Sequence, residues 1–278
     1  MTTWLIESNV YGDEITPLVA EIKRQGLPIA VIPYRSLTKG SVPLVDGQPV
    51  AADACVIGYG TFPFARQIQL HHTWRPGAWC NPQTLDCATY FAYFGQYLLN
   101  QNYIIMPGVE AIRQADWLFS TLAENEELFV RPTSCHKLFV GRRVSRDDFS
   151  RILAPTRYDP ATVIVIARPR DIGREWRLIV IGDQIISGSQ YAENCLRCIK
   201  SELPDNVTAF ASEMLQKISW RPDPIFMLDI CESEGGLHLV ELNSFSASWL
   251  YACDFAAVVK SASLLAESVA NHSYPVAR

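Results

Sequence analysis

Two carboxylates and a carboxamide in the last quarter of the chain have the side-chain types and the spacing of a Mg²⁺ site. Asp229 lies in one apolar run and Glu241 and Asn243 lie in the next, with Gly235-Gly236 predicting a hairpin turn between them. The hairpin would place Asp229 roughly opposite the other two, which share one strand face because residues two apart point the same way. Mg²⁺ prefers such oxygen ligands, and water and phosphate oxygens complete its shell.

A polar strand face at the edge of a sheet is the alternative interpretation of these three residues. The flanking segments, Phe226 to Leu228 and Leu237 to Val240, are strongly apolar, which places the polar groups at the rim of a core. Carboxylates in that position need partners, because burying an unpaired charge is costly. The apolar flanks therefore favour a ligand site.

Two cations earlier in the chain could bind the phosphates of a nucleotide. Arg131 ends an apolar run before Pro132, and Lys137 opens the next predicted strand, Leu138 to Val140. At an effective dielectric constant of about 20, a cation about 4 Å from a phosphate charge gains about 4 kcal/mol before desolvation. Both features are also common on ordinary strands, which is the alternative.

Glu175 and Arg177 form a third candidate group, because they share one face of a predicted strand. The segment just upstream is rich in arginine, so the density of positive charge around Arg177 is high. An exposed ion pair is the alternative. The sequence contains neither a Walker-type loop nor a Gly-x-Gly-x-x-Gly loop, so the two common nucleotide loops are excluded.

The composition is that of a globular protein. The chain has 278 residues, of which 49% are apolar and 19% charged, and this excludes disordered and fibrous classes. No apolar run approaches the roughly 18 residues of a membrane helix, so no membrane partner is expected. The N-terminus lacks the features of a secretion signal, and eight cysteines without one predict reduced thiols in the cytoplasm.

The charge is unevenly divided along the chain. The net charge is −5 overall, −5 over residues 1–130, +6 over 131–177 and −6 over 178–278. The total makes nucleic acid an unlikely partner. The division suggests two lobes with opposite electrostatic tasks, although chance surface decoration would give the same counts.

The first part of the chain is predicted to be an α/β domain. The expected strands are 3–8, 28–33, 54–57 and 103–106, a helix follows the first of them to about residue 25, and Asn81-Pro82 begins a helix that runs to about Leu99. Strands alternating with helices favour a parallel sheet. We expect the boundary to the next domain within 115–127.

The rest of the chain is predicted to be richer in strands, of the α+β type. Expected strands are 128–131, 138–140, 163–167, 176–181, 184–187, 225–230 and 237–242, with helices at 145–153, 206–218 and 254–269. Gly182-Asp183 predicts a hairpin turn. The fold class is therefore α/β, with an α+β C-terminal part.

In their order along the chain, these segments resemble the ATP-grasp superfamily. The residues that carry the resemblance are Phe129 to Pro132, Lys137, Glu175 to Arg177, Met227 to Asp229 and Val240 to Ser244. The branch that the chain resembles includes the eukaryotic assembly factor for translation initiation factor two and bacterial and phage proteins predicted to be peptide ligases. The resemblance covers residues 116–278.

The resemblance implies two domains and ATP and Mg²⁺ as cofactors. Residues 1–115 would be a Rossmann-like domain that chooses the substrate, and 116–278 an ATP-grasp domain with a basic nucleotide lobe (116–190) and a metal-carrying lobe (191–278). The charge division agrees with these two lobes.

The resemblance also assigns the residues of the site. The metal ligands would be Asp229, Glu241 and Asn243; the residues that bind the nucleotide would be Arg131, Lys137, Glu175 and the hinge residues Ile166, Ala167 and Arg168; and Arg177 would be catalytic. The loop from Pro132 to His136 departs from the family because it lacks a glycine-rich cover.

The implied activity is ligation of a carboxylate to an amine. The carboxylate attacks the γ-phosphate to give an acyl phosphate, and the amine then displaces phosphate, with Arg177 stabilising the transferring group. The partners would be ATP and a small-molecule, peptide or protein substrate. A non-enzymatic ATP-binding assembly factor is the alternative, and a metal-dependent nuclease would explain the carboxylates but leave the cations without a task.

Overall fold

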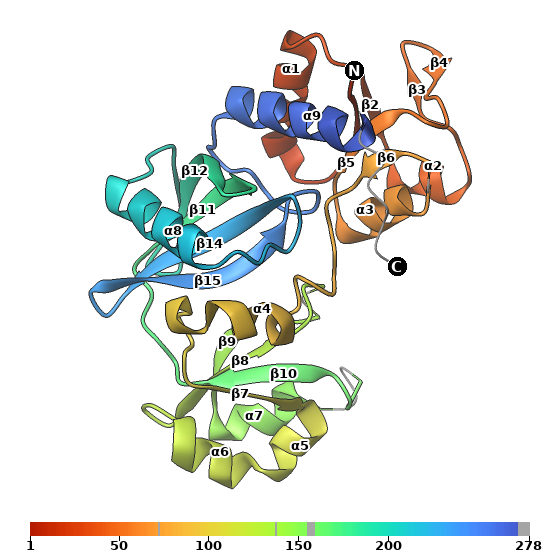
Figure 1. Cartoon of the computed structure of the whole chain (residues 1–278). Coiled ribbons are helices and arrows are strands. Elements are labelled where there is room, and N and C mark those ends of the chain that lie inside the picture. The colour runs from red at the N-terminus through yellow and green to blue at the C-terminus, as the bar shows by residue number, and fades with distance from the viewer. Residues whose placement is uncertain (72, 137, 155–158, 272–278) are drawn as a thin grey trace.

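The computed structural model describes residues 1–71, 73–136, 138–154 and 159–271, and their strands form three main sheets (Figure 1). A parallel sheet near the N-terminus lies at the top of the view, a five-stranded antiparallel sheet lies in the middle, and a four-stranded antiparallel sheet forms a separate lobe at the bottom. The chain is thus of mixed α/β type. None of the helices in the described part combines the length and apolarity that crossing a bilayer requires.

The N-terminal sheet has the strand order β2-β1-β5-β6, with all neighbours parallel. Its strands are β1 (Thr3–Glu7), β2 (Ile29–Ile32), β5 (Cys55–Tyr59) and β6 (Arg75–Gly77). The connections contain η1 (Gly12–Ile15), α1 (Thr16–Arg24), α2 (Tyr34–Thr38), α3 (Phe62–Gln69) and a small hairpin of β3 (Leu44–Val45) and β4 (Gln48–Pro49). Every residue of β1 is buried, as in parallel sheets that are covered on both faces.

The last helix of the chain, α9 (Phe255–Asn271), returns to the N-terminal sheet and packs beside α1 (Figure 1). Its residues Val258 and Ala262 share a buried cluster with Trp4 and Leu18 from the N-terminal sheet and α1. The same cluster contains Met227 of the five-stranded sheet, so α9 joins the two sheets. The predicted assignment of this helix to the metal-carrying lobe alone therefore misses half of its contacts.

The lower lobe has the strand order β7-β10-β8-β9. It consists of β7 (Tyr103–Pro107), β8 (Glu127–Pro132), β9 (Arg142–Ser145) and β10 (Val163–Ala167), with α5 (Gly108–Arg113), α6 (Ala115–Leu122) and α7 (Arg146–Ile152). Alternate residues of β8 and β10 pack on α6 and α7, because successive strand side chains face opposite sides. Ser145 caps α7 as predicted, its Oγ accepting the N–H of Asp148.

The five-stranded sheet has the strand order β13-β12-β11-β14-β15. Its strands are β11 (Arg174–Ile181), β12 (Gln184–Glu193), β13 (Leu196–Lys200), β14 (Ile225–Ser233) and β15 (Gly236–Ser244). One face is covered by α4 (Cys87–Phe94), η2 (Gly95–Tyr97) and α8 (Asp205–Lys217), and the other by α9. The predicted hairpin turns are confirmed, and Gly182 and Gly235 have φ of +58° and +77°, a conformation that glycine adopts without strain.

Sheet membership differs from the predicted domain boundaries. The strand at 103–107 belongs to the lower lobe, where it pairs antiparallel with β10, and β6 takes the fourth place in the N-terminal sheet. The boundary expected after residue 115 thus falls after this strand, and the boundary expected after 190 falls inside β12. A short apolar run has the same pattern in either kind of sheet, so its pattern does not identify its partner.

Two predicted elements are wrong in their details. The helix expected from Asn81 begins only after Asp86, which caps it by accepting the N–H of Ala88, whereas Asn81 caps a separate turn at Gln83. The strand expected at 138–140 is absent, because β8 pairs instead with residues 142–145.

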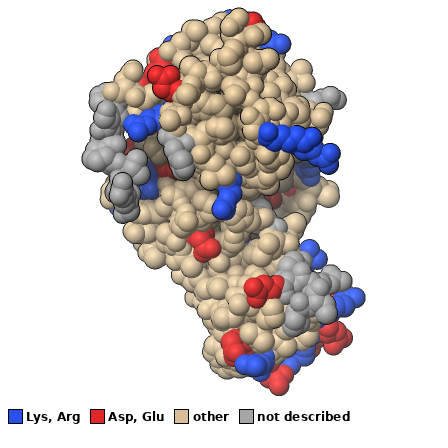
Figure 2. Space-filling model, turned by 90° about the vertical axis from the view of Figure 1, so that its right-hand side faces the viewer, with Lys and Arg blue, Asp and Glu red and all other residues tan. Residues whose placement is uncertain are grey.

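Most arginines of the predicted basic segment pair with carboxylates. The pairs outside the central cleft are Arg143–Asp171, Arg146–Asp116, Arg151–Asp148, Arg170–Glu234 and Arg174–Glu232. In Figure 2 the lower lobe accordingly shows side chains of both signs close together. The net charge of +6 is therefore largely balanced by neighbouring segments, and screening confines what remains to about a Debye length.

A half-buried carboxyl below the five-stranded sheet predicts a dependence of stability on pH. Burial raises the pKa of Asp223 from 3.8 to about 7, although its Oδ2 accepts the N–H of Asn81. The native state therefore binds a proton that the unfolded chain has lost, and stability falls as the pH rises from about 4 to about 7. Because Asp223 keeps part of its surface in water, we expect a loss of about 2 kcal/mol.

Asp223→Asn should remove this part of the pH dependence, because the amide oxygen keeps the hydrogen bond without the charge. Urea denaturation should show the variant more stable than the wild type at pH 8 and equally stable at pH 4. Equal stability at both values would contradict the assignment.

Candidate functional site

Three charged side chains lie in a row across the five-stranded sheet. Arg177 of β11 pairs in register with Asp229 of β14, which pairs with Glu241 of β15. The register therefore confirms the prediction that Asp229 lies opposite Glu241. Further along the same face, Ile179 and Met227 pack against α9, so the charged row continues a face that is otherwise part of the core.

Hydrogen bonds join the predicted metal ligands into one cluster. Nδ2 of Asn243 donates to Oδ2 of Asp229 and to Oε1 of Glu241, each at 2.9 Å. Arg177 grips Asp229 with two bonds, from Nε to Oδ1 at 2.8 Å and from its terminal nitrogen to Oδ2 at 2.6 Å. Arg177 and Asp229 are 6% and 1% exposed, so this is a buried, bidentate ion pair.

A second arginine joins this cluster from the lower lobe. Arg131 lies on β8, and its guanidinium donates to Oε2 of Glu241 at 2.9 Å, with both side chains 12% exposed. The contact links two sheets through residues 110 positions apart. Arg131 and Arg177 thus neutralise the two carboxylates from opposite lobes, which allows both to stay ionised in a confined site.

A cleft of about 220 Å³ opens between the two lobes at this cluster. Its polar walls are Arg131, Glu175, Tyr191 and Glu241. Its apolar walls come from both lobes, with Phe129, Phe139 and Val140 on the lower side and Ile172 and Val240 on the upper side. The cleft therefore has a flat, apolar part suited to an aromatic ring and a charged part suited to phosphates and a cation.

The predicted hinge residues do not line the cleft. Ile166 and Ala167 are fully buried in β10, which is paired on both sides, and Arg168 is exposed after the strand. The segment that reaches the cleft is the following one, at Ile172. Lys137, the second predicted phosphate ligand, lies outside the described residues.

Glu175 lies in the cleft in a setting that favours its protonated form. Burial is the largest cause that raises its pKa, and the charges of Asp229 and Glu241 raise it further, while a hydrogen bond from the Tyr191 hydroxyl at 2.8 Å opposes the shift. Of the predicted nucleotide-binding residues, Glu175 and Arg131 are the two that line the cleft.

No motif in the sequence indicates the aromatic clamp around Arg177. Tyr191 of β12 and Tyr251, after β15, stack at 5.1 Å, and the guanidinium lies 5.7 and 5.2 Å from their ring centres. Its third nitrogen donates to the carbonyl of Trp249 at 3.1 Å. Arg177 is therefore held on several sides, as a preorganised cation must be.

The donor set of the cluster fits Mg²⁺. Asp229 and Glu241 place carboxylate oxygens within hydrogen-bond distance of the same Asn243 nitrogen, and the amide oxygen of Asn243 supplies a third hard ligand. Each carboxylate oxygen has two lone pairs, so one hydrogen bond does not exhaust it. Among the described residues, no three His, Cys, Asp or Glu are placed to hold a metal together, so the amide oxygen is needed to complete this set.

Comparison with known proteins agrees with this geometry. The model of an ATP-grasp domain family, the third family of its clade, matches residues 39–262. A search of curated proteins by sequence finds no match.

Solved structures show the same fold. The D-cycloserine synthetase DcsG has a TM-score of 0.64 at 14% identity, covering 97% of this chain and 100% of its own. The ATP-grasp ligase PsnB, complexed with a minimal precursor, has a TM-score of 0.60 at 14% identity, covering 95% and 99%. D-Alanine–D-alanine ligase from Bacillus anthracis, complexed with ATP, has a TM-score of 0.59 at 12% identity, covering 97% and 98%.

Proposed function

Because this chain is an ATP-dependent ligase that belongs to this ATP-grasp domain family, we propose that it joins a carboxylate to an amine through an acyl phosphate. A substrate carboxylate oxygen attacks the γ-phosphorus of ATP, and ADP leaves. The amine nitrogen then attacks the acyl carbon, phosphate leaves, and the nitrogen loses a proton. The observation that carries the proposal is the cluster of Arg131, Arg177, Asp229, Glu241 and Asn243 between two lobes.

The cleft sets the orientation of the nucleotide in this proposal. The adenine lies between the apolar walls, with Phe129 and Phe139 on one side and Ile172 and Val240 on the other. The phosphates then point toward Arg131, which approaches the metal ligands from the lower lobe. Lys137 is kept as a second phosphate ligand on the strength of the sequence, whereas the segment at Ile172 replaces the predicted hinge residues as the neighbour of adenine.

The metal and Arg177 have separate tasks. Bound to Asp229, Glu241 and Asn243, Mg²⁺ would neutralise charge on the phosphates. Arg177 holds Asp229 in place and brings a fixed positive charge to the site of phosphoryl transfer. Glu175, held by Tyr191, completes the polar wall beside the nucleotide.

The N-terminal sheet provides the substrate side of the proposed enzyme. Its parallel strands and helices have the character of a Rossmann-like domain, and Tyr11 and Tyr59, at the carboxyl ends of β1 and β5, face the five-stranded sheet. The proposed substrates are a small molecule or a peptide. We also propose a cytoplasmic setting, because all eight cysteines are free thiols, which such a setting maintains.

The proposal predicts that release of ADP depends on both substrates. The measurement is ADP formation with ATP and Mg²⁺ across a panel of acids, each with and without a panel of amines. We expect turnover when a matching acid and amine are both present, and little with either alone. A binding-only assembly factor would instead be stabilised by ATP without turnover of any pair. A ligand at about 100 times its Kd adds about 2.7 kcal/mol of stability, so a thermal shift detects nucleotide binding in either case.

A further inference from the structure

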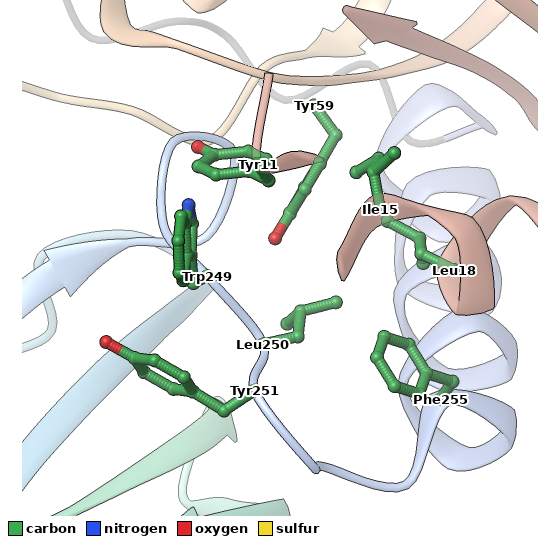
Figure 3. Close-up of a pocket in the computed structure, with 8 residues that line it drawn as sticks. All are labelled: Tyr11, Ile15, Leu18, Tyr59, Trp249, Leu250, Tyr251 and Phe255. Atoms are coloured by element: carbon green, nitrogen blue, oxygen red, sulfur yellow. The ribbon is translucent and has the colours of Figure 1, made fainter. Parts of the chain in front are cut away.

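An aromatic pocket lies between the N-terminal sheet and the segment after β15 (Figure 3). From the N-terminal side it is lined by Tyr11, Ile15 and Leu18, together with Tyr59 at the end of β5. The opposite wall is formed by residues 249–251 and by Phe255, the first residue of α9. Both sides of the pocket thus come from segments that join the substrate-side domain to the metal-carrying sheet.

The interior of this pocket is apolar although three of its residues carry polar atoms on aromatic rings. The hydroxyl of Tyr11 donates to the carbonyl of Gly60 at 2.6 Å, and the hydroxyl of Tyr59 donates to the carbonyl of Ser248. These bonds satisfy the phenols, so the rings present their faces to the pocket beside Ile15. A charged or strongly polar ligand group would lose its hydration here without gaining a partner, which is costly.

The pocket is separated from the nucleotide cleft by one stacked pair of rings. Tyr251 lines the pocket, and its stacking partner Tyr191 lines the cleft. Arg177 lies against both rings and is bonded to the Trp249 carbonyl. A group seated in the pocket therefore lies next to the cation at which the proposed phosphoryl transfer takes place.

The wall nearest to β1 has an uncommon backbone conformation. Tyr11 has a φ of +60°, and its neighbours Asn9 and Gly12 have φ of +61° and +53°. A left-handed conformation is unfavourable for a bulky residue, and such strain is concentrated at functional sites. The free space is about 10 Å³, the room of one water, so a larger group enters by displacing this segment.

We propose that this pocket selects the carboxylic-acid substrate by an apolar side chain, either aromatic or aliphatic. The carboxylate would lie at Arg177 and the side chain between Tyr11 and Phe255. The inference rests on the proposed ligase function, because it assigns a substrate class to the same site. It goes further in specifying that side chains of this substrate with a charge are rejected.

The test uses hydroxylamine as a general amine, because it traps acyl phosphates as hydroxamates whatever the natural amine is. The probes are pairs of acids of similar length, with and without a terminal charge: norleucine with lysine, and hexanoate with 6-aminohexanoate, along with 3-phenylpropanoate. We expect hydroxamate and ADP with the apolar members, with kcat/KM rising about fourfold for each added methylene until the pocket is full. Binding of the same acids is measured in parallel by thermal shift.

Two variants locate the selection in the pocket. Ile15 is the residue before α1, where aspartate is a preferred cap, so Ile15→Asp adds a charge without weakening the helix. It should reverse the preference within each pair, toward lysine and 6-aminohexanoate. Phe255→Ala enlarges the pocket and should shift the preference toward longer side chains. Leu264→Ala, a 59% exposed position of the same helix, is the matched control and should change nothing.

The outcomes separate this inference from the ligase proposal. Hydroxamate formed equally well from charged and apolar acids, or a ranking unchanged in Ile15→Asp, would overturn the pocket assignment while leaving the ligase intact. Selective binding of apolar acids that is lost in Ile15→Asp, without hydroxamate from any acid, would support the pocket and overturn the ligase proposal. Neither binding nor hydroxamate with any apolar acid would overturn both.

Discussion

Asp229→Ala is expected to lower kcat/KM for ADP release by at least about a thousandfold. The change removes a proposed Mg²⁺ ligand and also the only carboxylate that Arg177 grips with two bonds among the described residues. The measurement is steady-state ADP formation at saturating Mg²⁺. Asp171→Ala is the matched control, since Asp171 is a 96% exposed carboxylate with its own arginine partner, and this variant should retain wild-type activity.

Asn243→Ala separates the loss of the metal from the loss of the ion pair. This variant keeps Arg177 and Asp229 together, so the fold should survive while the proposed site loses its amide ligand. We expect ATP to stabilise this variant equally with and without Mg²⁺ in a thermal shift, whereas the wild type should need Mg²⁺ for its full shift. A folded Asn243→Ala protein with wild-type, Mg²⁺-dependent turnover would contradict the assignment of the metal site.

Arg177→Met is expected to destabilise the protein by about 3–5 kcal/mol, because it removes the cation that grips the buried Asp229 carboxylate. Asp229→Leu should cost a similar amount for the opposite reason. The double variant Arg177→Met/Asp229→Leu should be more stable than either single variant, since an apolar pair requires no compensation. Urea denaturation at pH 7 measures all four proteins.

The double variant also separates the two tasks of the ion pair. Its stability should recover while its turnover stays lost, because the site would then lack both the fixed cation and the metal ligand. Additive destabilisation in the double variant would show that the two side chains do not act as a pair.

The local part of the site could be predicted from the sequence because one hairpin builds it. Asp229, Glu241 and Asn243 lie on two strands joined by a glycine turn, and the alternation of strand side chains then fixes which of them meet. A single bulge after Asp229 shifts the later register but leaves the pairing of Asp229 with Glu241 in place. Local geometry of this kind requires no knowledge of the rest of the chain.

The contacts between lobes could not be predicted in the same way. The partner of Arg131 is Glu241, 110 residues away in another sheet, and neither residue carries a local signal of the other. The Tyr191–Tyr251 clamp depends on how the segment after β15 folds back over β12. Charge counts are also misleading, because the arginines of residues 131–177 find carboxylates outside that range, such as Glu232 and Glu234.

The strand at 103–107 and the last helix illustrate the limit for the fold. The sequence predicts both at about the right positions, yet each packs in a sheet other than the one expected, because an apolar pattern indicates which face is buried and not against what. The same ambiguity explains the misplaced adenine contact, since Ile166 and Ala167 are apolar as core residues of β10.

A crystal structure with a non-hydrolysable ATP analogue and Mn²⁺ tests the central claim most directly, because the anomalous signal of manganese locates the metal independently. Our account predicts a peak bound by oxygens of Asp229, Glu241 and Asn243, with the triphosphate passing Arg131 and the adenine between Phe129 and Ile172. Manganese and nucleotide bound away from this cluster, or a nucleotide in the cleft with the metal bound elsewhere, would contradict it.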